Sequence, residues 1–435
     1  MRIRLFGFFA YAVLGGTTAL GQGTAPRGVP ASLPTPAVYQ APANPPSGPD
    51  MGMQPTPSGQ AARQPTAEEK RKEELEALKR THAGPEDRFW VGASFLYWSI
   101  RDLPAPPTLI TANGQPVFGG QEIGLGNFRG MKLDAGIWLN ECHTWGLEGS
   151  AFLLEQRSLN QQFTGDGLGR AFNNVVAGQV ATGLPQIYPV NSAAVSVDSQ
   201  LGGFELNVVR NLRYDACWSF GALFGFRYID LEESLAINST TTGVPGLTFL
   251  GVPGQTSISL FDSIQTRNQV YAGQIGGRVE YQRGILVIGA MGKVAFGPNV
   301  QTNNILGQTT ASPGVGGVTV AQGGLLAAPP VPGTGTDTSS NYGQSSTDWF
   351  VVAPEFGIQI GLQLTSGIRT YIGYNYLFIN SVSRPTSQID TNVNPARLPS
   401  QPNFGLGGGS SVPALTQRQD NFFVHGISFG VELKF

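Results

Sequence analysis

Apolar and polar residues alternate with a period of two through most of the chain beyond Arg88. Near the end of the chain Phe429, Val431, Leu433 and Phe435 share one parity, and glycine or charged residues fill the positions between them. A period of two sends successive side chains to opposite faces of a β-strand. The chain beyond Arg88 is therefore predicted to be a succession of two-faced strands.

Ten segments with this pattern are long enough to cross a bilayer at a tilt. They are 89–100, 130–140, 144–155, 201–213, 217–231, 268–282, 285–297, 349–364, 367–380 and 421–435. Tight turns alternate with long loops, which are expected at 101–129, 156–200, 232–267, 298–348 and 381–420. Sorting of loop length by side is typical of outer-membrane barrels. The predicted fold is an all-β, transmembrane, antiparallel up-and-down β-barrel of about 10 strands, or 12 if 156–200 or 298–348 adds a hairpin.

The residues before the barrel divide into three segments. Residues 1–21 combine Arg2 and Arg4, an apolar run and small residues, which is the pattern of a signal peptide. Residues 22–65 are rich in Pro, Ala and Gly and are predicted to be a disordered tether. Residues 66–85 contain the charged run EEKRKEELEALKR and are predicted to include a short helix. The barrel is assigned to 86–435.

Composition narrows the function classes. Only 13% of the residues are charged, against about 25% in soluble domains. No apolar run after the N-terminal one reaches the roughly 18 residues of a transmembrane helix. The formal net charge of -2 gives no broad basic field, so nucleic acid is not an expected partner. The expected location is the outer membrane, with outer-membrane lipid as a partner.

The strand parity opposite to the apolar one predicts which charges line the barrel interior. These candidates are six cations and six anions: Lys132, Asp134, Glu148, Glu205, Arg227, Arg278, Glu280, Lys293, Glu355, Arg369, Glu432 and Lys434. Balanced charges can pair, and an eight-stranded barrel is already filled by its own side chains. Glycines of the same parity would leave space. Two alternatives result, a narrow or closed lumen and a pore for small solutes.

The chain offers little for catalysis. Gly426 to Gly430 matches the G-x-S-x-G pattern, but it lies within a period-two strand and not at a strand-to-helix turn. His425 and Ser428 are three residues apart and face opposite sides. The other histidines, His82 and His143, are isolated. We predict no catalytic residue, no metal site and no cofactor.

Two further pairs of residues are of structural interest. Cys142 and Cys217 fall at two short turns on one side of the predicted barrel, in an exported chain, and are candidates for a disulfide. Arg384 and Asp390 lie in the loop 381–420 and are expected to help order it over the barrel mouth. Long loops also leave open a different function, that of a surface adhesin or a ligand-binding barrel.

The strand residues resemble those of the seventh putative β-barrel porin family, known mainly from planctomycete genomes. The resemblance runs from FWVGASFLYW at 89–98 through GIWLNECHTWGLEGSAFLLE at 136–155 and NQVYAGQIGGRVEY at 268–281 to FFVHGISFGVELKF at the end of the chain. It implies an outer-membrane barrel without a defined substrate. Phe429, Val431, Leu433 and Phe435 look like the C-terminal signal that barrel-insertion machinery recognises, so that machinery is an expected partner.

Overall fold

The computed structural model describes residues 88–176, 179–180, 186–215, 217–313, 316–330, 340–406 and 411–435. All of them belong to one compact unit. The predicted signal peptide, tether and short helix lie outside the described residues. In the described part of the chain, no helix is long and apolar enough to span a membrane.

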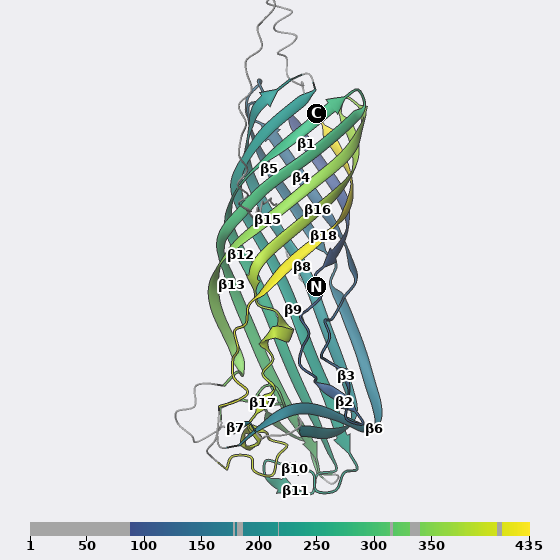
Figure 1. The fold of residues 1–435 in the computed structure, drawn as a ribbon, viewed down its shortest axis with the longest axis vertical. Coiled ribbons are helices and arrows are strands. Elements are labelled where there is room, and N and C mark those ends of the chain that lie inside the picture. The colour runs from purple at the N-terminus through teal and green to yellow at the C-terminus, as the bar shows by residue number, and fades with distance from the viewer. Residues whose placement is uncertain are drawn as a thin grey trace, which may run out of the picture. The chain divides into compact units, whose positions relative to one another are not determined.

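Eighteen strands make up most of the described structure, and two short 3-10 helices, η1 and η2, accompany them (Figure 1). The elements are β1 (Phe89–Ile100), β2 (Ile110–Ala112), β3 (Gln115–Phe118), β4 (Asn127–Trp138), β5 (Trp145–Leu154), β6 (Arg157–Val176), β7 (Gln179–Val180), β8 (Gln186–Tyr214), β9 (Trp218–Thr242), β10 (Thr248–Phe249), β11 (Val252–Pro253), β12 (Ser257–Arg283), β13 (Leu286–Ser312), β14 (Thr319–Gln322), β15 (Gly343–Thr365), β16 (Ile368–Val382), η1 (Pro385–Gln388), β17 (Asn392–Val393), η2 (Pro395–Arg397) and β18 (Asp420–Lys434).

Ten strands form a closed ring, and all of its pairings are antiparallel. The order around the ring is β1, β4, β5, β8, β9, β12, β13, β15, β16 and β18, and β18 pairs again with β1. Reciprocal backbone hydrogen bonds between Phe89 and Phe435 close the ring at the chain ends. The prediction of a ten-stranded up-and-down barrel is confirmed. β6 does not make a larger ring, because it pairs with β8 beyond the outer end of β5.

The outward face of the ring carries large exposed apolar side chains, which we call the apolar band. Its members include Val91, Phe95, Met131, Leu133, Leu147, Leu206, Phe224, Phe226, Ile275, Ile288, Phe296, Val352, Phe356, Ile358, Ile360, Leu362, Ile372, Phe429, Val431 and Leu433. The predicted C-terminal signal residues, Phe435 included, all lie on this exposed face. Large apolar side chains would not remain exposed to water over so many neighbouring strands.

The sequence prediction was wrong about the segments just beyond the ring strands. Residues 156–200, 232–267 and 298–348 were expected to be loops, but β6, β8, β9, β12 and β13 run through much of them. β9, for example, continues from Trp218 to Thr242, and β12 begins at Ser257. Beyond the apolar band, these five strands continue as one sheet (Figure 1). We call this part of the sheet the outer sheet.

A reversal of polarity along each strand explains this error. On β9 the outward residues change from Phe224 and Phe226 to Ser234 and Asn238, and the inward residues change to a buried apolar series that includes Leu235. The period of two continues, but the apolar parity moves to the other face. A search for strands with an apolar outward face therefore ends where the reversal occurs.

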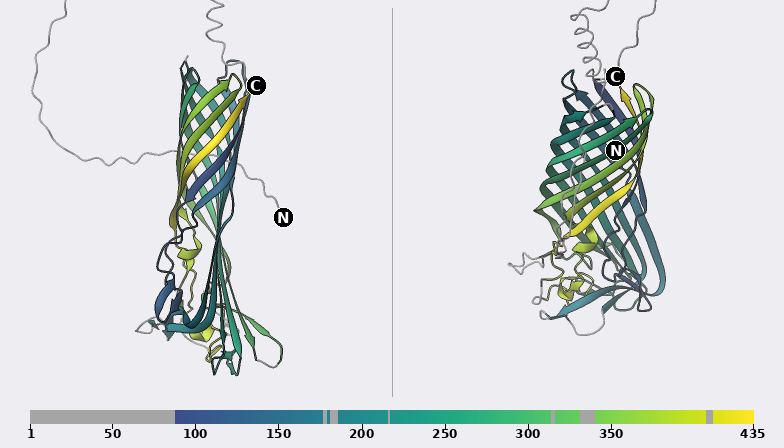
Figure 2. Two further views of the ribbon diagram at one scale, coloured as in Figure 1. Left: turned by 90° about the vertical axis from the view of Figure 1, so that its right-hand side faces the viewer. Right: turned by 45° about the horizontal axis from the view of Figure 1, so that its top comes forward.

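Buried residues of the outer sheet pack against the connecting segments. One cluster joins Val195, Leu235 and Ile264 of the sheet to Leu109 and Ile389 of the connections. A second joins Ile258 and Leu260 to Val393 and Leu398. The left view of Figure 2 shows the connections, including 383–406, gathered on one side of the outer sheet. The outer sheet is thus covered on its inward face, like the sheet of a soluble protein.

Candidate functional site

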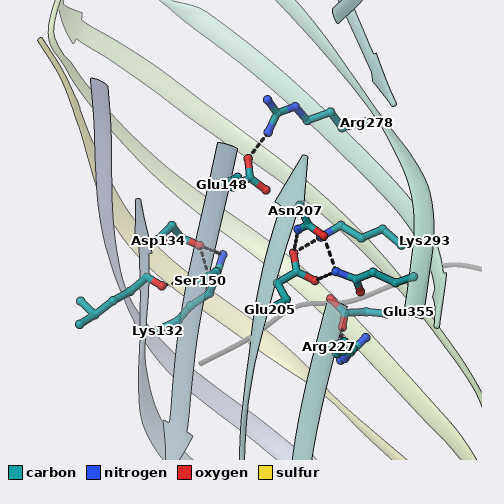
Figure 3. A network of polar contacts seen from close by, with 12 residues as sticks. Lys132, Asp134, Glu148, Ser150, Glu205, Asn207, Arg227, Arg278, Lys293 and Glu355 are labelled. Carbon is teal, nitrogen blue, oxygen red and sulfur yellow. Dashed lines mark hydrogen bonds and ion pairs between the residues drawn. The ribbon is translucent and has the colours of Figure 1, made fainter. Parts of the chain in front are cut away.

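The interior of the ring holds all twelve charged residues that strand parity assigned to it, and each of them forms an ion pair. Figure 3 shows the pairs of Lys132 with Asp134, Arg278 with Glu148, Lys293 with Glu205 and Arg227 with Glu355. Arg369 pairs with Glu280 and Glu432, and Lys434 pairs with Glu432. The sequence suggested that opposite charges could pair but did not indicate which residue would pair with which.

Several of these pairs join strands that are not neighbours in the ring. Arg227 on β9 donates to Glu355 on β15 at 3.3 Å, although β12 and β13 lie between these strands. Lys293 on β13 donates to Glu205 on β8 at 2.6 Å, with β12 and β9 between them. Side chains on such strands can meet only by crossing the inside of the ring. These ion pairs therefore span the barrel interior.

The pair of Lys293 and Glu205 is the centre of a larger polar network (Figure 3). The Gln274 amide donates to the Glu205 carboxylate and to Asn207 Oδ1, and Asn207 donates to Glu205 as well. All four side chains are buried. A buried carboxylate needs this number of donors, because water no longer solvates it.

Glycines of the inward parity make room for these side chains. A Cβ atom on Gly276 would meet the Lys293 side chain, and one on Gly221 would lie 3.2 Å from Arg278 Cγ. Trp90 covers Gly136 in the same way. The space that the inward glycines leave is filled by neighbouring side chains, so these glycines are not evidence of an open channel.

Exposure of most of the charged side chains falls along the barrel axis, although Arg369 is only 2% exposed at the end that holds the C-terminus. Near the end that holds the C-terminus, the side chains of Glu280 and Lys434 retain 30% and 29% exposure. Lys132 retains 17%, and Lys293 only 1%. Water therefore reaches the charges at this end of the interior and is excluded from the Lys293 level.

Apolar residues succeed the charged ones toward the outer sheet, and we call them the apolar layer. On β9 Arg227 is followed by Ile229 and Leu231, and on β15 Ala353 and Val351 come next on the outer side of Glu355. The layer comprises Leu96, Trp98, Ile100, Phe128, Phe152, Leu154, Leu201, Ile229, Leu231, Val270, Ala272, Ala295, Val351, Ala353, Leu377, Ile379, Val382, Phe422 and Val424. All ten ring strands contribute to this one cluster, so it crosses the interior.

A further buried ion pair lies beyond the apolar layer, and the sequence analysis did not predict it. Arg384 Nε and Nη2 donate to the two oxygens of Glu233 at 2.9 and 2.6 Å, and both side chains are fully buried. Arg384 Nη1 donates to the carbonyl oxygens of Arg101 and Asp102. The signal for Glu233 was present, because it interrupts the inward apolar series of β9. That stretch was interpreted as a loop.

Arg384 and Asp390 both order the connection that contains them, through different partners. Asp390 accepts hydrogen bonds from the backbone nitrogens of Asn392 and Ala414, both at 2.9 Å. Arg384 fixes the same connection to β9. Arg170 and Asp262 form a further buried pair at 2.8 Å between β6 and β12. The contact of Arg384 with Glu233 thus attaches the connection to the outer sheet, whereas the pair of Arg170 and Asp262 joins two strands within the sheet.

The predicted disulfide is absent, and Cys142 and Cys217 are both free and exposed. Cys142 lies between β4 and β5, and Cys217 lies between β8 and β9. The midpoints of these two turns are two strand spacings apart, about 9.6 Å. The Cα atoms of a disulfide lie within about 7 Å of each other, so lying on the same side of the barrel was not sufficient.

Ser428 of the G-x-S-x-G match and the neighbouring His425 do not contact each other. Ser428 is buried and accepts a hydrogen bond from Asn375 at 3.0 Å, whereas His425 Nδ1 lies 3.0 Å from the Tyr374 hydroxyl on the outward face. His143 stacks on Trp138 in the turn after β4. Within the described ranges, no group of three or more His, Cys, Asp or Glu side chains could hold a metal ion.

A family model and several solved structures are similar to this chain. A family model described as putative beta barrel porin-7 matches residues 105–435. No curated protein matches the chain. Among solved structures, the outer membrane protease OmpT from Escherichia coli is similar at 9% identity and a TM-score of 0.36, over 80% of this chain and 97% of that one. The translocator domain of autotransporter NalP from Neisseria meningitidis is similar at 10% identity and a TM-score of 0.24, over 84% and 95%.

Proposed function

Because the chain belongs to the putative beta barrel porin-7 family, we propose that it is an outer-membrane barrel whose interior is closed to ions and solutes and whose strands support a folded structure outside the cell. In this proposal the apolar band contacts lipid, and the outer sheet with its connections lies beyond the outer leaflet. The turns that contain Cys142 and Cys217 face the periplasm.

One observation carries the closed interior: ion pairs between strands that are not ring neighbours. Arg227 with Glu355, and Lys293 with Glu205, occupy the cross-section that a solute would have to pass. The apolar layer above them adds a second barrier, since an ion would lose its hydration there without finding polar partners. A wide diffusion pore also requires about 16 strands, and this ring has ten.

Single-channel recording tests this proposal directly. The refolded full chain in a planar bilayer is expected to show no unit conductance above background. Leu96 and Phe422 are fully buried members of the apolar layer on the neighbouring strands β1 and β18. Combining Leu96→Gly and Phe422→Gly with Lys293→Gly and Glu205→Gly opens both barriers, and this variant is expected to produce measurable steps. Reproducible steps from the unmodified protein would contradict the closed barrel and favour a small-solute pore.

A matched variant distinguishes the two barriers. Replacing both members of one central pair, Lys293→Met with Glu205→Leu, removes charge but keeps the interior filled. We expect this variant to remain non-conducting, because the apolar layer is intact. Conductance in this variant would show that the ion pairs alone close the barrel.

The outer sheet favours a second candidate function, that of a ligand-binding or adhesive barrel. The observation behind it is the length of β8, β9, β12 and β13, which have 25 to 29 residues each. Ten to 12 tilted residues are sufficient to cross a bilayer. Labelled protein in nanodiscs should then bind to cells or extracellular matrix, and binding that survives removal of the outer connections would argue against a role for those connections.

A further inference from the structure

The outward face of the outer sheet includes a surface without charge. Three consecutive rows of directly paired residues cross its five strands, and paired residues share one face of a sheet. The rows are Asn160, Ser196, Ala236, Ser263 and Leu306; Gln162, Ala194, Asn238, Phe261 and Gln308; and Thr164, Ser192, Thr240, Ser259 and Thr310. None of these 15 residues is charged, and 11 carry a hydroxyl or an amide. We call this surface the polar face.

An aromatic ring lies in the middle row of the polar face. Phe261 on β12 is 39% exposed. Its direct neighbours are Asn238 on β9 and Gln308 on β13, which are both exposed. In the adjacent row, the hydroxyls of Thr240 and Ser259 are 2.9 Å apart. An exposed ring is therefore flanked on both sides by uncharged donors and acceptors.

The described connections of the outer part do not cover this face. They pack on the inward side, where their apolar residues form clusters with the inward residues of the sheet. The left view of Figure 2 shows the opposite side of the sheet free of the segments 101–126 and 383–406. The polar face is therefore available to a partner.

The chemistry of the polar face selects its partner. A phosphate or an acidic polymer would find no cation in the three rows. The carboxylate of Asp198 in the next row already accepts hydrogen bonds from Ser158, Ser196 and Ser234, so a basic peptide would have to displace these contacts. An apolar partner would bury hydroxyls and amides without hydrogen bonds, which is unfavourable. A neutral sugar matches both components, because its C–H face can pack on the Phe261 ring while its hydroxyls pair with amide and hydroxyl side chains. We propose that the polar face binds neutral saccharide chains.

The position of the face identifies the source of the saccharide. On β12 the same outward parity passes from Phe261 to Ile275 of the apolar band without a change of side. The polar face thus stands directly above the surface that contacts lipid. The saccharide chains closest to it are those of outer-leaflet glycolipids, which extend away from the membrane beside the strands. We assign these chains as the ligand.

The test uses the full chain in phosphatidylcholine nanodiscs, because sugar-based detergents would compete. The probe is a free O-polysaccharide made only of neutral sugars, and binding is followed by calorimetry. Phe261→Leu keeps an apolar side chain but removes the ring, and we expect it to weaken binding about tenfold. Phe261→Trp should retain binding. A charged polymer, polygalacturonate, should not bind to either protein.

Three outcomes would overturn the inference. The first is equal binding of the neutral polysaccharide by the unmodified protein and the Phe261→Leu variant. The second is binding of polygalacturonate as strong as that of the neutral polysaccharide. The third is pairing of nanodiscs through the polar face, which would identify a second copy of the chain as the partner. Embedding the intact glycolipid in the nanodisc should abolish binding of the free polysaccharide, whereas glycolipid trimmed to its lipid portion should not. Saccharide binding and channel closure are measured separately, so either can fail alone.

Discussion

The long strands have opposite arrangements of apolar and polar residues in the ring and in the outer sheet. Near the short turns, β9 has aromatic residues outside and Arg227 inside. Farther out it has Ser234 and Asn238 outside and Leu235 inside. The backbone pairing between β9 and β12 continues through both regions without a register shift. The surrounding solvent, and not the strand geometry, therefore determines which parity is apolar.

Buried ion pairs occur in both regions but perform different tasks. In the ring, Arg227 and Glu355 join wall to wall across the interior. In the outer region, Glu233 and Arg384 join the wall to a connection. Because Arg384 also binds the carbonyl oxygens of Arg101 and Asp102, one guanidinium attaches two connections to β9. Loss of a pair should therefore affect only the region in which it lies.

The largest effect is expected from Arg384→Met. This change leaves Glu233 charged and buried without its partner, which destabilises the outer region by about 3–5 kcal/mol. Limited proteolysis should cleave 383–406 much faster, while heat modifiability on cold gels, which reports the ring, stays unchanged. The double variant Glu233→Leu with Arg384→Met removes both charges and should recover much of the resistance. If the Arg384→Met variant resisted proteolysis as well as the unmodified protein, the pair of Arg384 and Glu233 would not be what stabilises the outer region.

A smaller effect is expected from a lysine in the apolar band. Ile358→Lys places a charge at mid-height on the lipid-facing side of β15, which costs about 2–4 kcal/mol. The matched control, Gln265→Lys, lies on the outward side of β12 in the outer sheet and should change stability by less than about 0.5 kcal/mol. Unfolding by urea from phospholipid vesicles measures both. Equal effects would mean that lipid also covers the outer sheet.

The smallest effect is expected from Asp230→Asn. Asp230 accepts a hydrogen bond from Arg267 Nε at 2.9 Å on the outward face just above the apolar band. Its hydrogen bonds raise the pKa of Arg267 above the usual value. Because Arg267 is partly exposed, water can replace the lost contact, so the change should cost less than about 1 kcal/mol. The same urea unfolding measures it, and a loss above about 3 kcal/mol would show that the pair is shielded from water.

The ring could be predicted from the sequence because its pattern is local. The limits of β1 match the predicted 89–100, and two-residue turns at 284–285 and 366–367 connect paired strands, as the alternation of tight turns and long connections predicts. Parity alone placed Arg227 and Glu355 on one face. Their contact could not be predicted, because it depends on the tilt and stagger with which the ring closes. The disulfide prediction was wrong for a related reason. A disulfide depends on the distance between Cys142 and Cys217, whereas the sequence indicated only that both lie on the same side of the barrel.

The outer region was not predicted because every strand was assumed to have lipid on its outward face. Strands were expected to end where apolar residues left the outward parity, so Leu235 and Ile264 were assigned to loops. Both are buried strand residues in one cluster with the connections. A search for either parity of apolar residues would have extended β9 and β12. The pairing of Glu233 with Arg384 would still have required the fold, because the two residues lie 151 positions apart in the chain.

The unbroken pairing of β9 and β12 has a mechanical consequence. Their ladder runs in one register from Ser257 and Thr242 in the outer sheet to Tyr281 and Trp218 at the opposite end, beside the short turns. Antiparallel hydrogen bonds lie perpendicular to the strands, so a pull on the outer sheet along the strand direction loads them in shear, many at once, and does not unzip them one by one. No flexible joint separates the two regions along these strands. Tension applied to the outer sheet is therefore transmitted directly to the ring.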